Sequence, residues 1–219
     1  MSQTACRFEK PVTRVVAFDY LLYLPKGYEA GGSWPLILFL HGAGERGHDL
    51  TLLNKHPLPK LLMGESDLPF VVVSPQCPED NWWPMMVDDL AVLLDDVMTR
   101  YRIDPKRVYL TGLSMGGFGT WALACAHPEL FAAIAPICGG IYGPTSAVQV
   151  LKDVPVWAFH GALDPVVPVE SSEKLVDELR QVGGDVRLTV YPDLEHDSWT
   201  VTYNNPELYA WFLSHTKGG

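Results

Sequence analysis

Short runs of consecutive apolar residues recur along the chain, separated by stretches with helical periodicity. The clearest runs are Leu36 to Leu40 (LILFL) and Phe70 to Val73 (FVVV). A strand that is apolar at every position must be buried on both faces, which is typical of a parallel sheet covered by helices. Further strands are expected at Val15 to Leu24, Val108 to Leu110, Ala132 to Ile137, Val154 to Phe159 and Val186 to Tyr191.

Helical patterns lie between these runs. From Met86 to Tyr101, apolar residues recur at steps of three and four, with acidic residues between them, which predicts one amphipathic helix. Strands that alternate with helices predict an α/β fold, with a mostly parallel sheet and helices on both faces. In such sheets ligands bind beyond the carboxyl ends of the strands. Further helices are expected at Pro59 to Met63, Met115 to Ala126, Ser171 to Val182 and Pro206 to Ser214.

Length and charge limit what this fold can do. The 219 residues suit one domain, so a single catalytic domain is expected over residues 1–219. The net charge is −10, and contacts to phosphate groups need clustered Lys and Arg. Nucleic acid and anionic membrane are therefore disfavoured as partners. The apolar runs are also far shorter than the roughly 20 residues that span a bilayer.

The cysteines and the N-terminus point to a cytoplasmic protein. Residues 1–10 contain charged residues and lack the apolar region of a signal peptide. The four cysteines are dispersed, without the paired spacing of a zinc site, so no metal is expected and reduced thiols are predicted. The alternative is a secreted protein that has lost its signal, in which cysteines could pair. The cysteines are Cys6, Cys77, Cys125 and Cys138.

A Gly-x-Ser-x-Gly motif lies between a strand and a helix. The motif, Gly112 to Gly116, directly follows the run Val108 to Leu110 and leads into the helical pattern that starts at Met115. In this context the chain turns sharply and exposes the serine hydroxyl, and only small neighbours allow the close approach. The motif predicts that Ser114 is a nucleophile.

A serine nucleophile needs a base and an orienting acid. His196 follows the last expected strand and is the best candidate for the base. Asp164 follows the strand before it, and the chain order Ser114, Asp164, His196 is the order in which this kind of fold places nucleophile, acid and base. Asp193 and Asp197, which are close to His196 in sequence, are alternatives for the acid.

The other histidines are given smaller roles. His127 and His215 are expected at the surface, and His48 and His56 lie in a polar loop that could touch a ligand. His41 and His160 end apolar strands and are expected to pack on the backbone.

Two backbone amides are expected to stabilise the oxyanion that forms when the serine attacks. One is the amide of Met115, which follows the nucleophile. The other is in the glycine-rich loop after Leu36 to Leu40, where Ala43 is the favoured donor. The loop after Phe70 to Val73 must lie at the same edge of the sheet. It contains the expected substrate-binding residues Gln76, Trp82 and Trp83, although packing over the next helix is an equal alternative for the tryptophans.

Taken together, these motifs resemble the α/β-hydrolases. The resemblance is to the small phospholipase/carboxylesterase and dienelactone-hydrolase-like branch, and within it to esterases related to polyhydroxybutyrate depolymerases and feruloyl esterases. It covers most of the chain, from about Tyr20 to His196, and implies Ser114, Asp164 and His196 as nucleophile, acid and base, with oxyanion amides at Ala43 and Met115. Dienelactone hydrolases use a cysteine nucleophile, so Ser114 excludes that activity. The segments that carry the resemblance are Tyr20 to Pro25, His41 to Gly47, Gly112 to Gly117, His160 to Asp164 and His196.

The segment where many α/β-hydrolases carry a lid is short in this chain. Cys138 to Asp153 reads as a loop, too short for a lid domain. The expected function is therefore a serine carboxylesterase that hydrolyses short-chain, small-molecule esters without a cofactor. The alternatives are a peptidase of the prolyl-oligopeptidase type and an acyl-protein thioesterase. A remoter alternative is a non-catalytic binding module on the same fold. The sequence does not indicate an oligomeric state.

Overall fold

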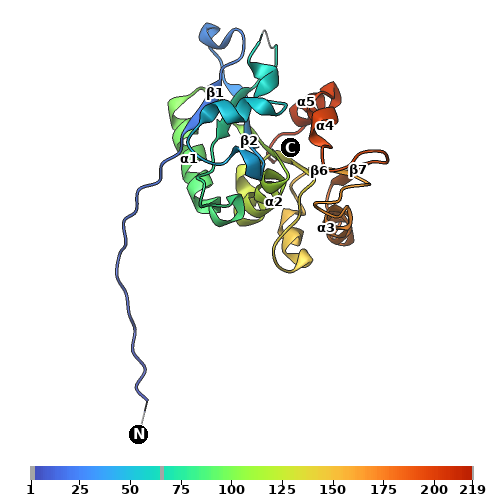
Figure 1. The fold of residues 1–219 in the computed structure, drawn as a ribbon. Helices are drawn as coiled ribbons and strands as arrows, with labels where there is room; N and C mark the ends of the chain where they lie inside the picture. Colours follow the sequence, from blue (N-terminus) through green and yellow to red (C-terminus); the bar gives the residue numbers. More distant parts are fainter. Residues whose placement is uncertain (1–2, 65–66, 219) are drawn as a thin grey trace.

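The described part of the chain, residues 3–64 and 67–218 of a computed structural model, is built around one seven-stranded sheet (Figure 1). The strand order is β1-β3-β2-β4-β5-β6-β7. β1 runs antiparallel to β3, and all other neighbours are parallel, as predicted. The strands are β1 (Tyr20–Tyr23), β2 (Trp34–Leu40), β3 (Val71–Pro75), β4 (Ile103–Leu113), β5 (Ala133–Ile137), β6 (Val156–Gly161) and β7 (Val186–Tyr191).

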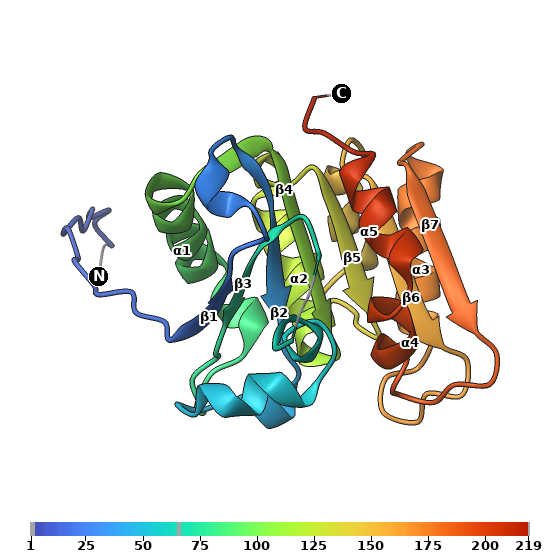
Figure 2. The ribbon, with the colours of Figure 1, turned by 90° about the horizontal axis from the view of Figure 1, so that it is seen from above.

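Helices cover both faces of the sheet, which confirms the α/β-hydrolase fold class. Figure 2 shows α4 and α5 on one face and α1, α2 and α3 on the other. The helices are α1 (Val87–Arg100), α2 (Met115–Ala126), α3 (Glu170–Gln181), α4 (Trp199–Tyr203) and α5 (Pro206–Leu213). Short 3-10 turns connect the elements: η1 (Tyr28–Ala30), η2 (Ala43–Glu45), η3 (Leu50–Lys55), η4 (Lys60–Leu62), η5 (Trp83–Met85), η6 (Pro128–Leu130) and η7 (Thr145–Leu151).

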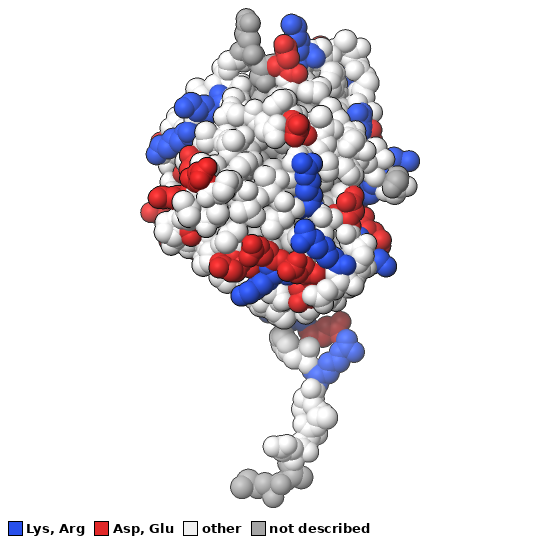
Figure 3. Space-filling view, turned by 90° about the vertical axis from the view of Figure 1, so that its right-hand side faces the viewer, with Lys and Arg blue, Asp and Glu red and all other residues white. Residues whose placement is uncertain are grey.

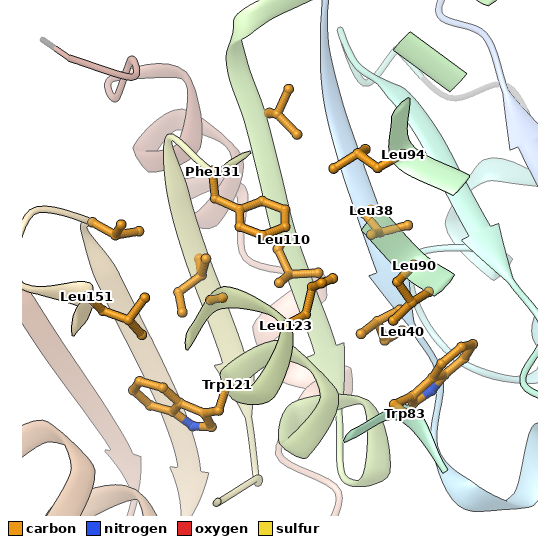
Figure 4. Packing of buried hydrophobic residues seen from close by; sticks show 14 of the residues in the cluster. Leu38, Leu40, Trp83, Leu90, Leu94, Leu110, Trp121, Leu123, Phe131 and Leu151 are labelled. Carbon is orange, nitrogen blue, oxygen red and sulfur yellow. The ribbon is translucent and has the colours of Figure 1, made fainter. Parts of the chain in front are cut away.

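The continuous apolar runs form strands because successive side chains enter two different cores. Leu38 and Leu40 of β2 pack with Leu90 and Leu94 of α1 (Figure 4). The intervening Phe39 points to the opposite face, where it meets Tyr203 edge to face at 5.6 Å between ring centroids. Both faces are therefore apolar, and the pattern of the sequence follows from their burial.

Three expected elements differ in the structure. The strand predicted at Val15 to Leu24 is limited to Tyr20–Tyr23, because β1 pairs only along β3 and the preceding residues leave the sheet edge (Figure 1). The helix predicted at Pro59 to Met63 is the 3-10 turn η4. The loop predicted at Cys138 to Asp153 contains η7, which is held against α3 by hydrogen bonds from Thr145 and Gln149 to Glu178. η7 is a short 3-10 helix of 7 residues and not a lid domain.

The parallel strands bring their carboxyl ends to one edge of the sheet. Leu40 at the end of β2 is in register with Gly112 of β4, and Gly161 of β6 is in register with Tyr191 of β7. Segments far apart in the sequence therefore meet at this edge. Within the described residues, none of the helices is long and apolar enough to cross a membrane.

Candidate active site

Ser114 lies in a tight turn between β4 and α2. Its backbone has φ 51° and ψ −115°, in the left-handed range of φ that a non-glycine residue adopts only under strain. The turn is held by hydrogen bonds, from the Ser114 amide to Ile137 O at 3.0 Å and from the Phe118 amide to Ser114 O at 3.0 Å. Gly116 must be glycine, because a Cβ there would lie 1.9 Å from the Leu40 carbonyl oxygen. The close packing also places the loop after β2 directly against the serine turn.

His196 and Asp164 approach Ser114 from the loops after β7 and β6. His196 Nε2 lies 2.9 Å from Ser114 Oγ, and His196 Nδ1 lies 2.7 Å from Asp164 Oδ2. The structure therefore brings together the three residues that the sequence predicts as nucleophile, base and acid. The alternative acids do not make this contact: Asp193 is exposed, and the Asp197 carboxylate accepts hydrogen bonds from Thr200.

The surroundings of Asp164 keep its carboxyl group ionised. Burial by itself would raise the pKa of Asp164, but hydrogen bonds from His196 and from the amides of Val166 and Val167 hold that pKa below its usual value. An ionised carboxylate only accepts, so His196 Nδ1 must carry its proton. His196 Nε2 is then free to accept the hydroxyl proton of Ser114, which is the arrangement that a general base requires.

The loop after β2 contains the expected oxyanion donor. His41 Nε2 accepts a hydrogen bond from the Cys77 amide at 2.9 Å, so Nδ1 carries the proton and donates to Gly42 O at 2.6 Å. That carbonyl shares a planar trans peptide with the Ala43 amide, which must point the opposite way. His41 therefore orients the Ala43 amide. Among the described residues, no protein group accepts a hydrogen bond from the amides of Ala43 or Met115.

His41 performs this role as a neutral ring. It is 1% exposed, and burial lowers its pKa to about 4. The expectation that His41 packs on the backbone is confirmed by its hydrogen bonds to Cys77 and Gly42. The consequence for the oxyanion loop was not expected, because the sequence does not indicate the direction of either ring nitrogen.

A buried carboxylate supports the same loop. Glu45 is 5% exposed, and its Oε1 lies 3.1 Å from His56 Nε2. Burial would raise the pKa of Glu45, but the His56 ring, His41 and the Gly42 backbone hold that pKa below its usual value. Glu45 therefore keeps a negative charge within the glycine-rich loop and connects the loop to His56.

Two of the three predicted substrate-binding residues are buried and donate hydrogen bonds to this loop. Gln76 is 2% exposed, and its Nε2 donates to Glu45 O at 2.7 Å and to Asp49 O at 2.9 Å. Trp83 is 0% exposed, and its Nε1 donates to His41 O at 3.0 Å. Both predictions were wrong for one reason: the side-chain N–H groups of these residues donate to the backbone of the oxyanion loop. Trp82 is partly buried, with the Arg46 guanidinium 5.6 Å from its ring centroid, and its substrate contact stays a prediction.

An aromatic wall stands on the other side of His196. The Trp199 ring meets His196 edge to face at 5.2 Å and meets His56 edge to face at 5.5 Å. The sequence places Trp199 near the base, but nothing in it links His56 to either residue. A surface groove of about 520 Å³ continues beyond this wall and is lined by His56, Asp197, Thr200 and Asn204 among others. A larger hollow of about 690 Å³, which includes His215, lies at the opposite edge of the sheet and contacts none of these residues.

Within the described residues, one group of side chains has the spacing of metal ligands. It combines the Cys138 thiol with Asp164 and His196, whose ligand atoms lie within 4.8 Å of one another. Asp164 and His196 are already paired with each other at 2.7 Å. Burial raises the pKa of the Cys138 thiol far above its usual value, so this sulfur remains protonated and is a poor ligand. The four cysteines are free thiols.

The relatives of the chain include an esterase and a depolymerase. The chain is 25% identical over 169 residues to a probable feruloyl esterase C of Aspergillus terreus, a match that covers 76% of this chain and 62% of that protein. It is 27% identical to a poly(3-hydroxyoctanoate) depolymerase of Pseudomonas fluorescens, with 87% and 77% of the two chains covered. The chain thus spans about three fifths of the feruloyl esterase.

Solved structures and a family profile agree with these relatives. A thermostable esterase has a TM-score of 0.76 and 37% identity, over 90% of this chain and 59% of that one. The esterase PE8 has a TM-score of 0.67 and 23% identity, over 91% and 99%, which is evidence for the fold alone. The profile of the phospholipase/carboxylesterase family matches residues 73–205, more than half of the sequence. On this evidence the chain belongs to the phospholipase/carboxylesterase family.

Proposed function

We propose that the protein is a serine carboxylesterase that hydrolyses short-chain esters of small molecules. The observation that carries the proposal is the hydrogen-bonded series from Ser114 through His196 to Asp164, at 2.9 and 2.7 Å. The proposal includes a single catalytic domain over residues 1–219, because the strands of one sheet support all three residues and the oxyanion loop.

In the proposed reaction His196 takes the proton of Ser114 as the hydroxyl oxygen attacks the ester carbonyl. The amides of Ala43 and Met115 stabilise the oxyanion, and Asp164 stabilises the imidazolium. The proton then passes from His196 to the alcohol as the C–O bond breaks, which leaves an acyl-enzyme on Ser114. Water, deprotonated by His196, then attacks the acyl carbon, and the proton passes from His196 to Ser114 Oγ as the carboxylic acid leaves. No metal or organic cofactor has a step in this scheme.

The shape of the site supports a preference for small ester substrates. The segment between β5 and β6 contains only η7, which packs on α3, so a lid does not enclose a long acyl chain. The groove beyond Trp199 and His56 offers room for part of the substrate. Feruloyl esters are natural test substrates, because a feruloyl esterase is among the similar proteins. Peptides and thioesters remain the alternative substrates of the same three residues.

The proposal also concerns partners and location. Basic and acidic side chains are interspersed on the face drawn in Figure 3, which is unlike the clustered basic surface that binds nucleic acid. With the net charge of −10 this supports a small-molecule substrate in place of a polyanion or an anionic membrane. The four free thiols support a cytoplasmic location, where disulfides are rare.

The test is an acyl-chain series of p-nitrophenyl esters from acetate to laurate, measured beside a feruloyl ester, a thioester and a peptide anilide. We expect the highest kcat/KM on short acyl chains and covalent labelling of Ser114 by a fluorophosphonate. Ser114→Ala should lower kcat at least ~10³-fold. The proposal fails if the purified protein hydrolyses no ester and is not labelled, or if Ser114→Ala keeps its activity. A preference for the anilide or thioester would favour an alternative substrate class.

A further inference from the structure

His160 is a buried histidine that the proposed reaction does not use. It lies in β6, four residues before Asp164, and its side chain is 0% exposed. Its Nδ1 lies 2.7 Å from Ser172 Oγ on α3, and its Nε2 lies 2.9 Å from Val167 O. Both ring nitrogens therefore have fixed partners.

These partners determine the tautomer of the ring. A carbonyl oxygen only accepts, so His160 Nε2 must carry the hydrogen that bonds to Val167 O. Nδ1 is then the acceptor for the hydroxyl of Ser172. Burial lowers the pKa of His160, so the ring stays neutral at neutral pH.

The same Nε2–H faces the acid. His160 Nε2 lies 3.3 Å from Asp164 Oδ2, the oxygen that is 2.7 Å from His196 Nδ1. Asp164 Oδ1 accepts from the amides of Val166 and Val167. One carboxylate oxygen is thus held by the backbone, and the other lies between two imidazole rings. The titratable groups that face this oxygen are His160, His196 and the Cys138 thiol.

We propose that His160 is a positioning residue for the acid, with its Nε2–H, oriented by Ser172, holding Asp164 Oδ2 in line with His196 Nδ1. The inference rests on the proposed function, because it assigns a support to the acid of that site. His160 neither gains nor loses a proton. As a neutral hydrogen-bond donor, it stabilises the negative charge of Asp164. This limits how strongly the carboxylate favours the protonated form of His196.

Loss of this donor has two expected effects. Asp164 is less well oriented, so kcat falls by about tenfold, while KM changes little because His160 does not contact the substrate. Without the His160 donor, the negative charge of Asp164 also acts more strongly on His196, so the base is more easily protonated. The acidic midpoint of the kcat/KM profile should therefore move to higher pH. A residue that only fills space would not move this midpoint.

Three variants and one control test the proposal. His160→Leu removes both ring nitrogens and should show the full effect on kcat and on the acidic midpoint. His160→Gln keeps an N–H donor near the position of Nε2 and should recover most of the activity. Ser172→Ala removes the partner that orients the ring and should be intermediate. His127→Leu is the control, because His127 is a partly exposed histidine at the C-terminal end of α2, the end opposite Ser114.

The proposal is overturned if folded His160→Leu keeps the kcat and pH profile of the unmodified protein, or if His160→Gln is as impaired as His160→Leu with an unchanged acidic midpoint. If His160→Leu does not fold, the kcat and the acidic midpoint of Ser172→Ala and His160→Gln are compared with those of the unmodified protein. Unchanged values in Ser172→Ala then overturn the proposal. A readout without turnover is the proton NMR signal of the hydrogen shared by His196 and Asp164. It should shift in His160→Gln and Ser172→Ala, and an unmoved signal contradicts the proposal. Failure of the proposed function shows instead as activity that survives Ser114→Ala.

Discussion

Acid should destabilise this protein through His41. The ring is 1% exposed, and its Nε2 accepts the Cys77 amide, so a proton on Nε2 would break a buried hydrogen bond. Burial lowers the pKa of His41 to about 4 in the folded chain, against 6.5 for an ordinary histidine. Between these two values the unfolded chain binds a proton and the folded chain does not. The stability that His41 contributes is therefore complete above pH 6.5 and is lost as the pH falls to about 4.

The magnitude follows from the difference between the two pKa values. At 1.36 kcal/mol for each tenfold change, the gap from 6.5 to about 4 corresponds to ~3 kcal/mol. This is a large part of the ~5–15 kcal/mol by which folded domains are stable. Other groups, including Asp164 and His160, also titrate differently in the folded chain. Their effect is separated from that of His41 by comparison with a variant.

The assay is urea unfolding from pH 7.5 to 4.5 for the unmodified protein and for His41→Phe. The variant keeps an aromatic ring but cannot be protonated, and at pH 7.5 it should be ~1–3 kcal/mol less stable because the Cys77 amide loses its acceptor. Over this pH range the unmodified protein should lose about 2.5 kcal/mol more than the variant. Parallel curves for the two proteins would refute the reasoning. His127→Phe, at a partly exposed position, is the control for loss of a histidine.

Three further predictions concern the surroundings of the site. Gly116→Ala places a Cβ 1.9 Å from a backbone oxygen of β2, so we expect loss of soluble, folded protein. Gly44→Ala is the control, because the space around its Cβ is open, and it should fold normally in the same expression and melting experiment. A thiol reagent should label the exposed Cys6 fast and the partly buried Cys125 slowly in the native protein, because burial raises the pKa of the Cys125 thiol to about 12. All four cysteines should react after denaturation, and fast labelling of the buried Cys77 or Cys138 in the native state contradicts the described burial. Glu45→Ala removes the partner of His56 and should lower the free energy of unfolding by about 1–3 kcal/mol, as measured by urea unfolding. An unchanged free energy of unfolding would show that the buried carboxylate does not stabilise the loop.

Local patterns were enough to predict most of the fold. Each apolar run that follows the first became a strand because burial on both faces requires apolar residues at every position. The exception is the N-terminal run, where pairing depends on how far β3 extends beside it. Met115–Ala126 matches its predicted bounds because the glycines of the serine turn mark its start in the sequence.

The side chains that support the site could not be predicted in this way. Gln76 and Trp83 follow a strand end, as a substrate-binding residue would, yet both donate hydrogen bonds to the oxyanion loop. Sequence position restricts where a residue can lie, but the direction of its polar atoms depends on which backbone groups other segments leave unpaired nearby. The ring contact of His56 with Trp199 was not predicted either, because the two residues lie far apart in the sequence and only the fold brings them together.

The sequence by itself determined the sheet and the positions of Ser114, Asp164 and His196 at its carboxyl edge, because strand periodicity and the glycine turn are local properties. Only the tertiary structure decided which tautomers His41 and His160 adopt and which groups they hold. Each of these rings bonds to groups from other parts of the chain, such as the Cys77 amide and the Ser172 hydroxyl. A hydrogen bond needs both partners in place, and the folded chain alone brings them within about 3 Å.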